Sequence, residues 1–75
     1  MKPKTLAELA VGQSAAVKEI RGSDDVCVRL LEMGLIPGTP VSMIGVAPLG
    51  DPLELEVRGY HLSIRRSEAA RVEIA

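Results

Sequence analysis

Alternation of apolar and polar residues is clearest in the second half of the chain, over two runs of five residues. Leu53–Val57 carries apolar residues at every second position with glutamates between them, and Tyr60–Ile64 repeats the alternation with polar residues between. A period of two predicts strands with one buried face. Arg58-Gly59 supplies a glycine for a two-residue turn, so we predict a hairpin that places Glu56 opposite His61.

A helical pattern precedes this hairpin, between Ser23 and about Met33. The apolar residues that fall on one helical face are Val26, Cys27, Leu30 and Leu31. Ser23 is predicted to cap the helix, and Asp24 and Asp25 stand where the helix dipole favours negative charge. Because Cys27 shares the apolar face, we expect it to be a buried packing residue.

The helix is expected to end sharply and to lead directly into a strand. Gly34 stands where a helix C′ residue needs positive φ, and Leu35 can fold back onto Leu30. Pro37 followed by Gly38 predicts a type II turn, with positive φ at the glycine. A helix and a strand are therefore joined by almost no loop.

The rest of the chain reads as short elements between Gly and Pro breaks. Thr5 is predicted to cap a helical turn over 6–9, with Glu8 completing a capping box. The other expected elements are strands over 14–20, 41–46 and 72–74, a loop over 48–52 and a helical turn over 67–70. We predict one mainly β domain of the α+β class over residues 1–75, with one inserted helix. Physical reasoning alone allows a small barrel or an open, strongly bent sheet.

Composition and charge reduce the number of function classes that the chain can belong to. Nine basic and ten acidic residues give a net charge of −1, and the single Tyr is unaccompanied by Phe or Trp. A cationic face and stacking aromatics are what nucleic-acid binding needs, so no nucleic-acid partner is expected. One Cys, a start at Met1 without a secretory pattern and no membrane-length apolar run predict a cytoplasmic protein. Any transport role would be accessory.

Catalytic motifs are not found. Gly34 and Gly38 follow a helix, whereas a phosphate loop precedes one and carries a Lys that is missing here. Cys27 lies on the apolar face with acidic residues nearby, which disfavours a reactive thiolate. A proline-binding groove needs several aromatic residues, and Tyr60 stands alone. We expect no enzyme, no catalytic residue and no required cofactor.

His61 is the candidate for metal chemistry. Glu56 should stand directly opposite it and Glu54 diagonally, on the polar face of the hairpin. One interpretation is a solvated cross-strand pair worth roughly 0.2–1 kcal/mol. The other is a weak surface site for Zn²⁺ or Fe²⁺, which a second molecule or solvent would have to complete.

Apolar residues near the turns are the candidates for partner binding. They are Leu35, Ile36 and Leu49. Loop-borne apolar residues suit protein contacts, but in so small a domain they can equally fill the core. For Leu35 the core is the favoured interpretation, whereas for Leu49 both remain open.

Two stretches together resemble the FeoA family: LLEMGLIPGTPV from Leu30 to Val41 and APLGDPLELEVRGYHLSIRR from Ala47 to Arg66. The resemblance implies an SH3-like barrel of about five strands, with the helix inserted after the first. It also implies an accessory protein of bacterial ferrous iron uptake that docks on the cytoplasmic side of the FeoB GTPase transporter and promotes Fe²⁺ transport. Such a protein would reach the membrane through its partner.

An alternative follows from the same resemblance. A FeoA-type domain also ends certain metal-dependent repressors, where it follows a helix-turn-helix domain. Because Met1 begins almost at the domain, a regulator of this kind would lack its DNA-binding helix-turn-helix domain. The alternative is therefore a stand-alone regulatory or metal-sensing module. A weak homo-oligomer is compatible with both interpretations.

Overall fold

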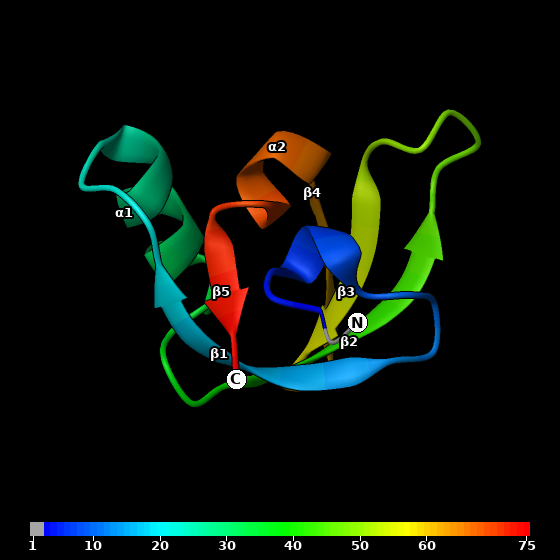
Figure 1. Ribbon diagram of the computed structural model, residues 1–75, viewed down its shortest axis with the longest axis horizontal. Helices are drawn as coiled ribbons and strands as arrows, with labels where there is room; N and C mark the ends of the chain where they lie inside the picture. The colour runs from blue at the N-terminus through cyan, green and yellow to red at the C-terminus, as the bar shows by residue number, and fades with distance from the viewer. Residues whose placement is uncertain (1–2) are drawn as a thin grey trace.

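A computed structural model describes residues 3–75. Met1 and Lys2 belong to the N-terminal segment in which no secretory pattern was found, and they lie outside the described residues. The elements in chain order are η1 (Leu6–Glu8), β1 (Ser14–Ile20), α1 (Asp25–Glu32), β2 (Pro40–Val46), β3 (Leu53–Val57), β4 (Tyr60–Ile64), α2 (Arg66–Ala69) and β5 (Val72–Ile74). The strands form one antiparallel sheet in the order β4-β3-β2-β1-β5 (Figure 1).

Strand β1 gives the sheet its curvature because it pairs with two different neighbours. Its first half lies beside β2, with Ala15 opposite Val41. Its second half lies beside β5, from Val17 opposite Ile74 onward, and the register shifts by a bulge within this pairing. A bulge bends a strand and increases its twist. The sheet therefore curls around a central core, and η1 and α2 lie over the space between β5 and β3 (Figure 1).

The core draws on every strand and on all three helices. Its members are Leu6, Leu9, Val17, Leu30, Leu35, Val41, Met43, Leu53, Leu55, Val57, Ile64, Ala69, Val72 and Ile74. The alternation in β3 is confirmed, since its three apolar side chains are fully buried and its glutamates are exposed. The predicted register is also confirmed, because Glu56 lies opposite His61.

The helix stop forms as the sequence indicates. Gly34 has φ 104°. Its N–H donates to the Leu31 carbonyl at 3.0 Å, and the Leu35 N–H donates to the Leu30 carbonyl at 3.2 Å. These two bonds define a Schellman motif, and both Leu30 and Leu35 are fully buried, as its hydrophobic contact requires.

The turn after the helix is also as predicted. The Thr39 N–H donates to the Ile36 carbonyl at 3.0 Å, and Gly38, at the third position of the turn, has φ 91°. That conformation is the one that a type II turn requires of its third residue. Strand β2 begins at Pro40, one residue earlier than expected.

Two predictions of helix capping are wrong. The N-cap of α1 is Asp24 rather than Ser23: its carboxylate accepts the Cys27 N–H at 3.4 Å. A carboxylate is favoured over a hydroxyl here because it also binds a guanidinium. Thr5 does not cap η1 with its side chain; its hydroxyl donates to the Glu8 carboxylate at 3.2 Å, and the element is a single 3-10 turn.

Candidate functional site

The polar face of the β3–β4 hairpin carries the predicted metal pair. Glu56 and His61 lie opposite each other and both are exposed, while Glu54 lies opposite Ser63 and so diagonal to the histidine. Arg58 (φ 50°) and Gly59 (φ 85°) form the tight turn that sets this register. Within residues 3–75 no three His, Cys, Asp or Glu side chains come together to hold a metal ion. The hairpin therefore offers two ligands, which is too few for a closed site.

The three apolar residues proposed as partner contacts separate into two groups. Leu35 is fully buried, because the Schellman motif folds it onto Leu30, so the structure removes it from the surface. Ile36 is 44% exposed and Leu49, in the loop between β2 and β3, is 97% exposed. These two remain available to a partner.

Sequence reasoning missed the exposed apolar side of α1. Val28 and Leu31 are 52% and 39% exposed, whereas Cys27 and Leu30 face the core. The signal was present, since residues three apart share a helical face and those two pairs lie on different faces. Cys27 is buried as expected.

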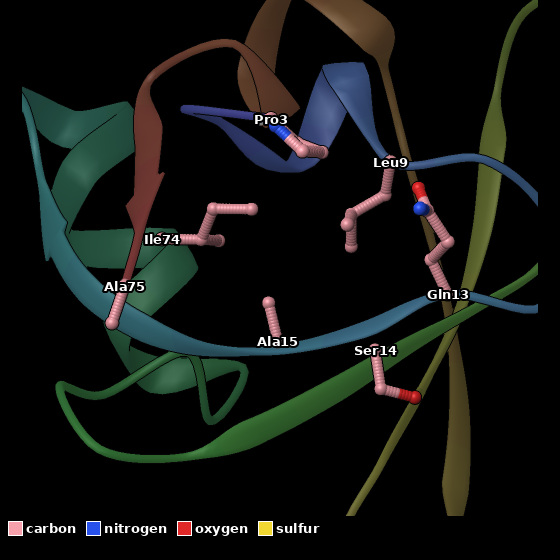
Figure 2. Close-up of a pocket in the computed structure, with 7 residues that line it drawn as sticks. All are labelled: Pro3, Leu9, Gln13, Ser14, Ala15, Ile74 and Ala75. Atoms are coloured by element: carbon pink, nitrogen blue, oxygen red, sulfur yellow. The ribbon is translucent and has the colours of Figure 1, made fainter. Parts of the chain in front are cut away.

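A cleft of about 340 Å³ lies between β1, the end of β5 and the segment around η1. Its lining residues are Pro3, Leu9, Gln13, Ser14, Ala15, Ile74 and Ala75. Figure 2 shows the Leu9, Ala15 and Ile74 side chains pointing toward a common space. The hydrophobic pattern could not reveal this cleft, because its walls come from both ends of the chain.

Charged side chains position α1 against the sheet. Arg71 donates to both carboxylate oxygens of Asp24, at 3.1 Å and 2.5 Å, and also to the Arg21 carbonyl. The hydrogen bond from Arg71 lowers the pKa of the Asp24 carboxyl group. Likewise, the hydrogen bond from Arg21 lowers the pKa of Glu73. Both pKa shifts arise in ion pairs that hold elements together, Asp24 with Arg71 and Glu73 with Arg21. Neither ion pair includes Glu56 or His61 of the hairpin.

Fold and surface together define a small SH3-like domain: a curled five-stranded antiparallel sheet, a helix between β1 and β2, and exposed apolar and cleft surfaces. The FeoA domain model matches residues 4–75, and the chain belongs to the FeoA family. The expected fold class and family are thereby confirmed. No helix within residues 3–75 is long and apolar enough to cross a bilayer.

One curated relative links the family directly to ferrous iron transport. It is the Fe(2+) transport protein A/Fe(2+) transporter FeoB fusion protein of Porphyromonas gingivalis, 35% identical over 69 residues. Those residues make up 92% of this chain but 8% of the relative. This chain thus corresponds to a small part of that protein, in which a FeoA part and a FeoB part share one polypeptide.

Solved structures agree with this assignment. Iron(II) transport protein A from Clostridium thermocellum superposes with a TM-score of 0.89 at 31% identity, covering 93% of this chain and 43% of that one. FeoA from Stenotrophomonas maltophilia, described as a unique procaryotic SH3 domain protein and solved in complex with zinc, gives 0.85 at 34% identity, covering 97% and 91%.

A more distant likeness concerns fold alone. IdeR from T. acidophilum has a TM-score of 0.81 at 24% identity, covering 93% of this chain and 32% of that one. At this level of identity the shared fold carries no statement about regulation or metal sensing by this chain.

Proposed function

We propose that this protein is an accessory of bacterial ferrous iron uptake that docks on the cytoplasmic side of a FeoB-type GTPase transporter and promotes Fe²⁺ transport. The observation that carries the proposal is the fusion of a FeoA part to a FeoB part in the Porphyromonas gingivalis relative. Two activities joined in one polypeptide are held at high effective concentration, which favours contact between them.

The surface of the domain supports a binding role. Ile36 and Leu49 expose large apolar side chains. Burying such a side chain against a partner removes it from water, which makes the free energy of binding more favourable. Leu49 stands at the tip of a loop, where it can enter a pocket on another protein. We propose both residues as transporter contacts.

Promotion of transport would follow from selective binding. A protein that binds two states of a transporter equally well changes neither population, whereas a tenfold preference shifts the equilibrium by about 1.4 kcal/mol. The domain would therefore act by binding one conformational or nucleotide state of its partner more tightly than the other.

Metal binding in this proposal is weak and is not required. The Glu56–His61 pair supplies an imidazole and a carboxylate on an open sheet face. A relative solved with zinc makes a transition-metal contact chemically reasonable for this family. A second molecule or solvent would complete the coordination here.

The test uses the full-length FeoB-type transporter of the same organism, reconstituted in liposomes. Added domain should bind the transporter and raise the initial rate of Fe²⁺ uptake, and a heat-denatured sample of the domain should do neither. A wild-type domain that shows no binding at concentrations up to about 1 mM, equivalent to about −4 kcal/mol, would overturn the proposal.

A further inference from the structure

The loop between β2 and β3, residues 47–52, is closed by its own backbone (Figure 1). The Gly50 N–H donates to the Ala47 carbonyl at 2.7 Å, which places Leu49 at the third position of a β-turn. The second position is a proline, whose φ is fixed in advance. The Ala47 N–H donates to the Pro52 carbonyl at 3.1 Å and so joins the two ends of the loop. The shape of the loop is therefore set within the domain.

Arg66, the first residue of α2, ties this loop to the rest of the domain. Its Nε donates to the Gly50 carbonyl at 3.0 Å, and its backbone N–H donates to the Asp51 carboxylate at 2.9 Å. A second guanidinium nitrogen donates to the Ala7 carbonyl in η1, also at 3.0 Å. A guanidinium holds its donors in one rigid plane, so one side chain can fix two acceptors relative to each other. The loop is thus held against both η1 and α2.

These bonds fix the backbone of the loop without burying its tip. Leu49 is 97% exposed, so almost none of its side chain packs on the domain that holds its backbone. A fixed backbone that carries an unpacked aliphatic side chain is the arrangement expected of a binding anchor. Less conformational entropy is lost on binding when the loop is already ordered, which makes the free energy of binding more favourable.

We propose that residues 47–52 are a pre-organised docking loop whose Leu49 enters an apolar pocket of the transporter, and that Arg66 is the positioning residue that holds Leu49 in its binding orientation. An aliphatic side chain at a convex tip complements a concave apolar site, since its burial displaces water and leaves no polar group unpaired. This inference rests on the proposed function, which names the transporter as the partner, and it adds how the contact is presented.

The experiment measures binding of the intact domain to the same full-length transporter in nanodiscs, in a double-mutant cycle of Leu49→Ala and Arg66→Met. Methionine keeps an unbranched stem but makes neither guanidinium bond. Each single variant should weaken binding at least about threefold. In the Leu49→Ala background, Arg66→Met should change affinity by less than about 1.5-fold, because a positioning residue has no effect once the side chain that it positions is gone.

Arg65→Met is the matched control. It removes the same charge from the neighbouring residue, whose side chain, within the described part of the chain, donates no hydrogen bond to residues 47–52. Its affinity should stay within about twofold of wild type, so a larger loss in Arg66→Met does not come from charge alone. If Arg66→Met does not fold, Asp51→Ala replaces it in the cycle, since that variant removes the tie to the Arg66 backbone.

The order of the loop in the free wild-type domain supplies a second readout, which depends on no variant. Backbone NMR relaxation should give order parameters of about 0.85 for Leu49 and Gly50, the value of rigid backbone, and Arg66→Met should lower them below about 0.6. Wild-type values below about 0.6 would mean that the loop is not pre-organised. The inference would then be wrong and the proposed function would stand.

The binding assay decides the remaining alternatives. Wild-type affinity in folded Arg66→Met, or an equal loss with and without Leu49, overturns the positioning role and leaves the proposed function intact. If the wild-type domain does not bind the transporter, the proposed function and the docking loop both fail. If the domain self-associates, and Leu49→Ala abolishes the self-association while leaving transporter binding unchanged, the loop meets a second copy of this chain and the inference is wrong.

Discussion

At the scale of single residues, Gly34 has two reasons to be glycine. Its φ of 104° belongs to the region that side chains disfavour, and a Cβ at this position would collide with the Tyr60 hydroxyl. That hydroxyl donates to the Met33 carbonyl at 2.5 Å, so it is fixed in place at the end of the helix. Gly38 has a similar φ of 91° but nothing within reach of a Cβ.

Substitution of the two glycines is therefore expected to lower the free energy of unfolding by different amounts. Gly38→Ala should lower the free energy of unfolding by about 1 kcal/mol, from backbone strain alone. Gly34→Ala should cost at least about 2 kcal/mol, because strain and collision add. Urea denaturation of both variants measures the difference. In a Tyr60→Phe background the two costs should become similar; an unchanged difference would show that the hydroxyl is not responsible.

The Asp24–Arg71 pair makes stability depend on pH. Because the hydrogen bond from Arg71 lowers the pKa of Asp24 in the folded state, its stabilisation is present above the ordinary carboxyl value of 3.8. It is lost as the pH falls through the lower folded value. Asn at this position still caps the helix but cannot form the ion pair.

Thermal melts of wild type and Asp24→Asn at about pH 7 and about pH 2.5 test this dependence. Wild type should melt at the higher temperature at neutral pH, and the difference between the two melting temperatures should narrow in acid as Asp24 becomes protonated. Other carboxylates titrate in both proteins and cancel. A gap of the same size at both pH values would mean that the ion pair contributes nothing.

At the scale of elements, local pattern was sufficient where one rule dominates. The hairpin follows from a period of two and a glycine turn, and the helix stop follows from Gly34 with Leu35. The N-cap was not predictable in this way, because Asp24 is selected by Arg71, which is 47 residues away. The exposure of Leu31 likewise depends on how α1 is oriented on the sheet.

Helix α1 should depend on one face for its attachment. Leu30 is fully buried, so Leu30→Ala should lower the free energy of unfolding by about 2–5 kcal/mol through lost burial and a cavity. Val28→Ala, on the exposed face of the same helix, should change it by no more than about 0.5 kcal/mol. Equal effects in a denaturant titration would contradict the assigned orientation.

The exposed apolar residues of the loops predict a loss of binding without a loss of stability. Leu49→Asp and Ile36→Asp should each weaken transporter binding roughly three- to tenfold, about 0.7–1.4 kcal/mol, as expected for peripheral contacts. Thermal midpoints should stay within a few degrees of wild type, because neither side chain belongs to the core. Val11→Asp, at another exposed apolar position, serves as the control.

At the scale of the whole molecule, an open two-ligand pair predicts metal binding that depends on protein concentration. Zn²⁺ or Fe²⁺ titration should give weak binding that strengthens as a second molecule supplies ligands. His61→Ala should abolish this binding and Glu56→Gln should reduce it, whereas Glu8→Gln, in η1 and outside the hairpin, should not change it. Tight one-to-one binding retained in His61→Ala would place the site elsewhere.

The molecule as a whole also explains why the cleft escaped prediction. Its walls are Pro3 and Leu9 from the beginning of the chain and Ile74 and Ala75 from the other end of it, with β1 between them. Periodicity reports which face of an element is buried, but not which strands become neighbours. The resemblance to a family supplied the fold that the pattern left open between a barrel and an open sheet.

The pairing of β5 has a consequence for synthesis of the protein on the ribosome. Thr5 lies opposite Glu73, and the Ile74 N–H donates to the Lys4 carbonyl. The segment before η1 therefore pairs with β5 in the folded domain. A nascent chain can form the β3–β4 hairpin early, because its contacts are local. It cannot close its core until residues 72–74 have left the exit tunnel. Translation that stops before Val72 therefore yields no smaller working module, only a substrate for proteases and chaperones.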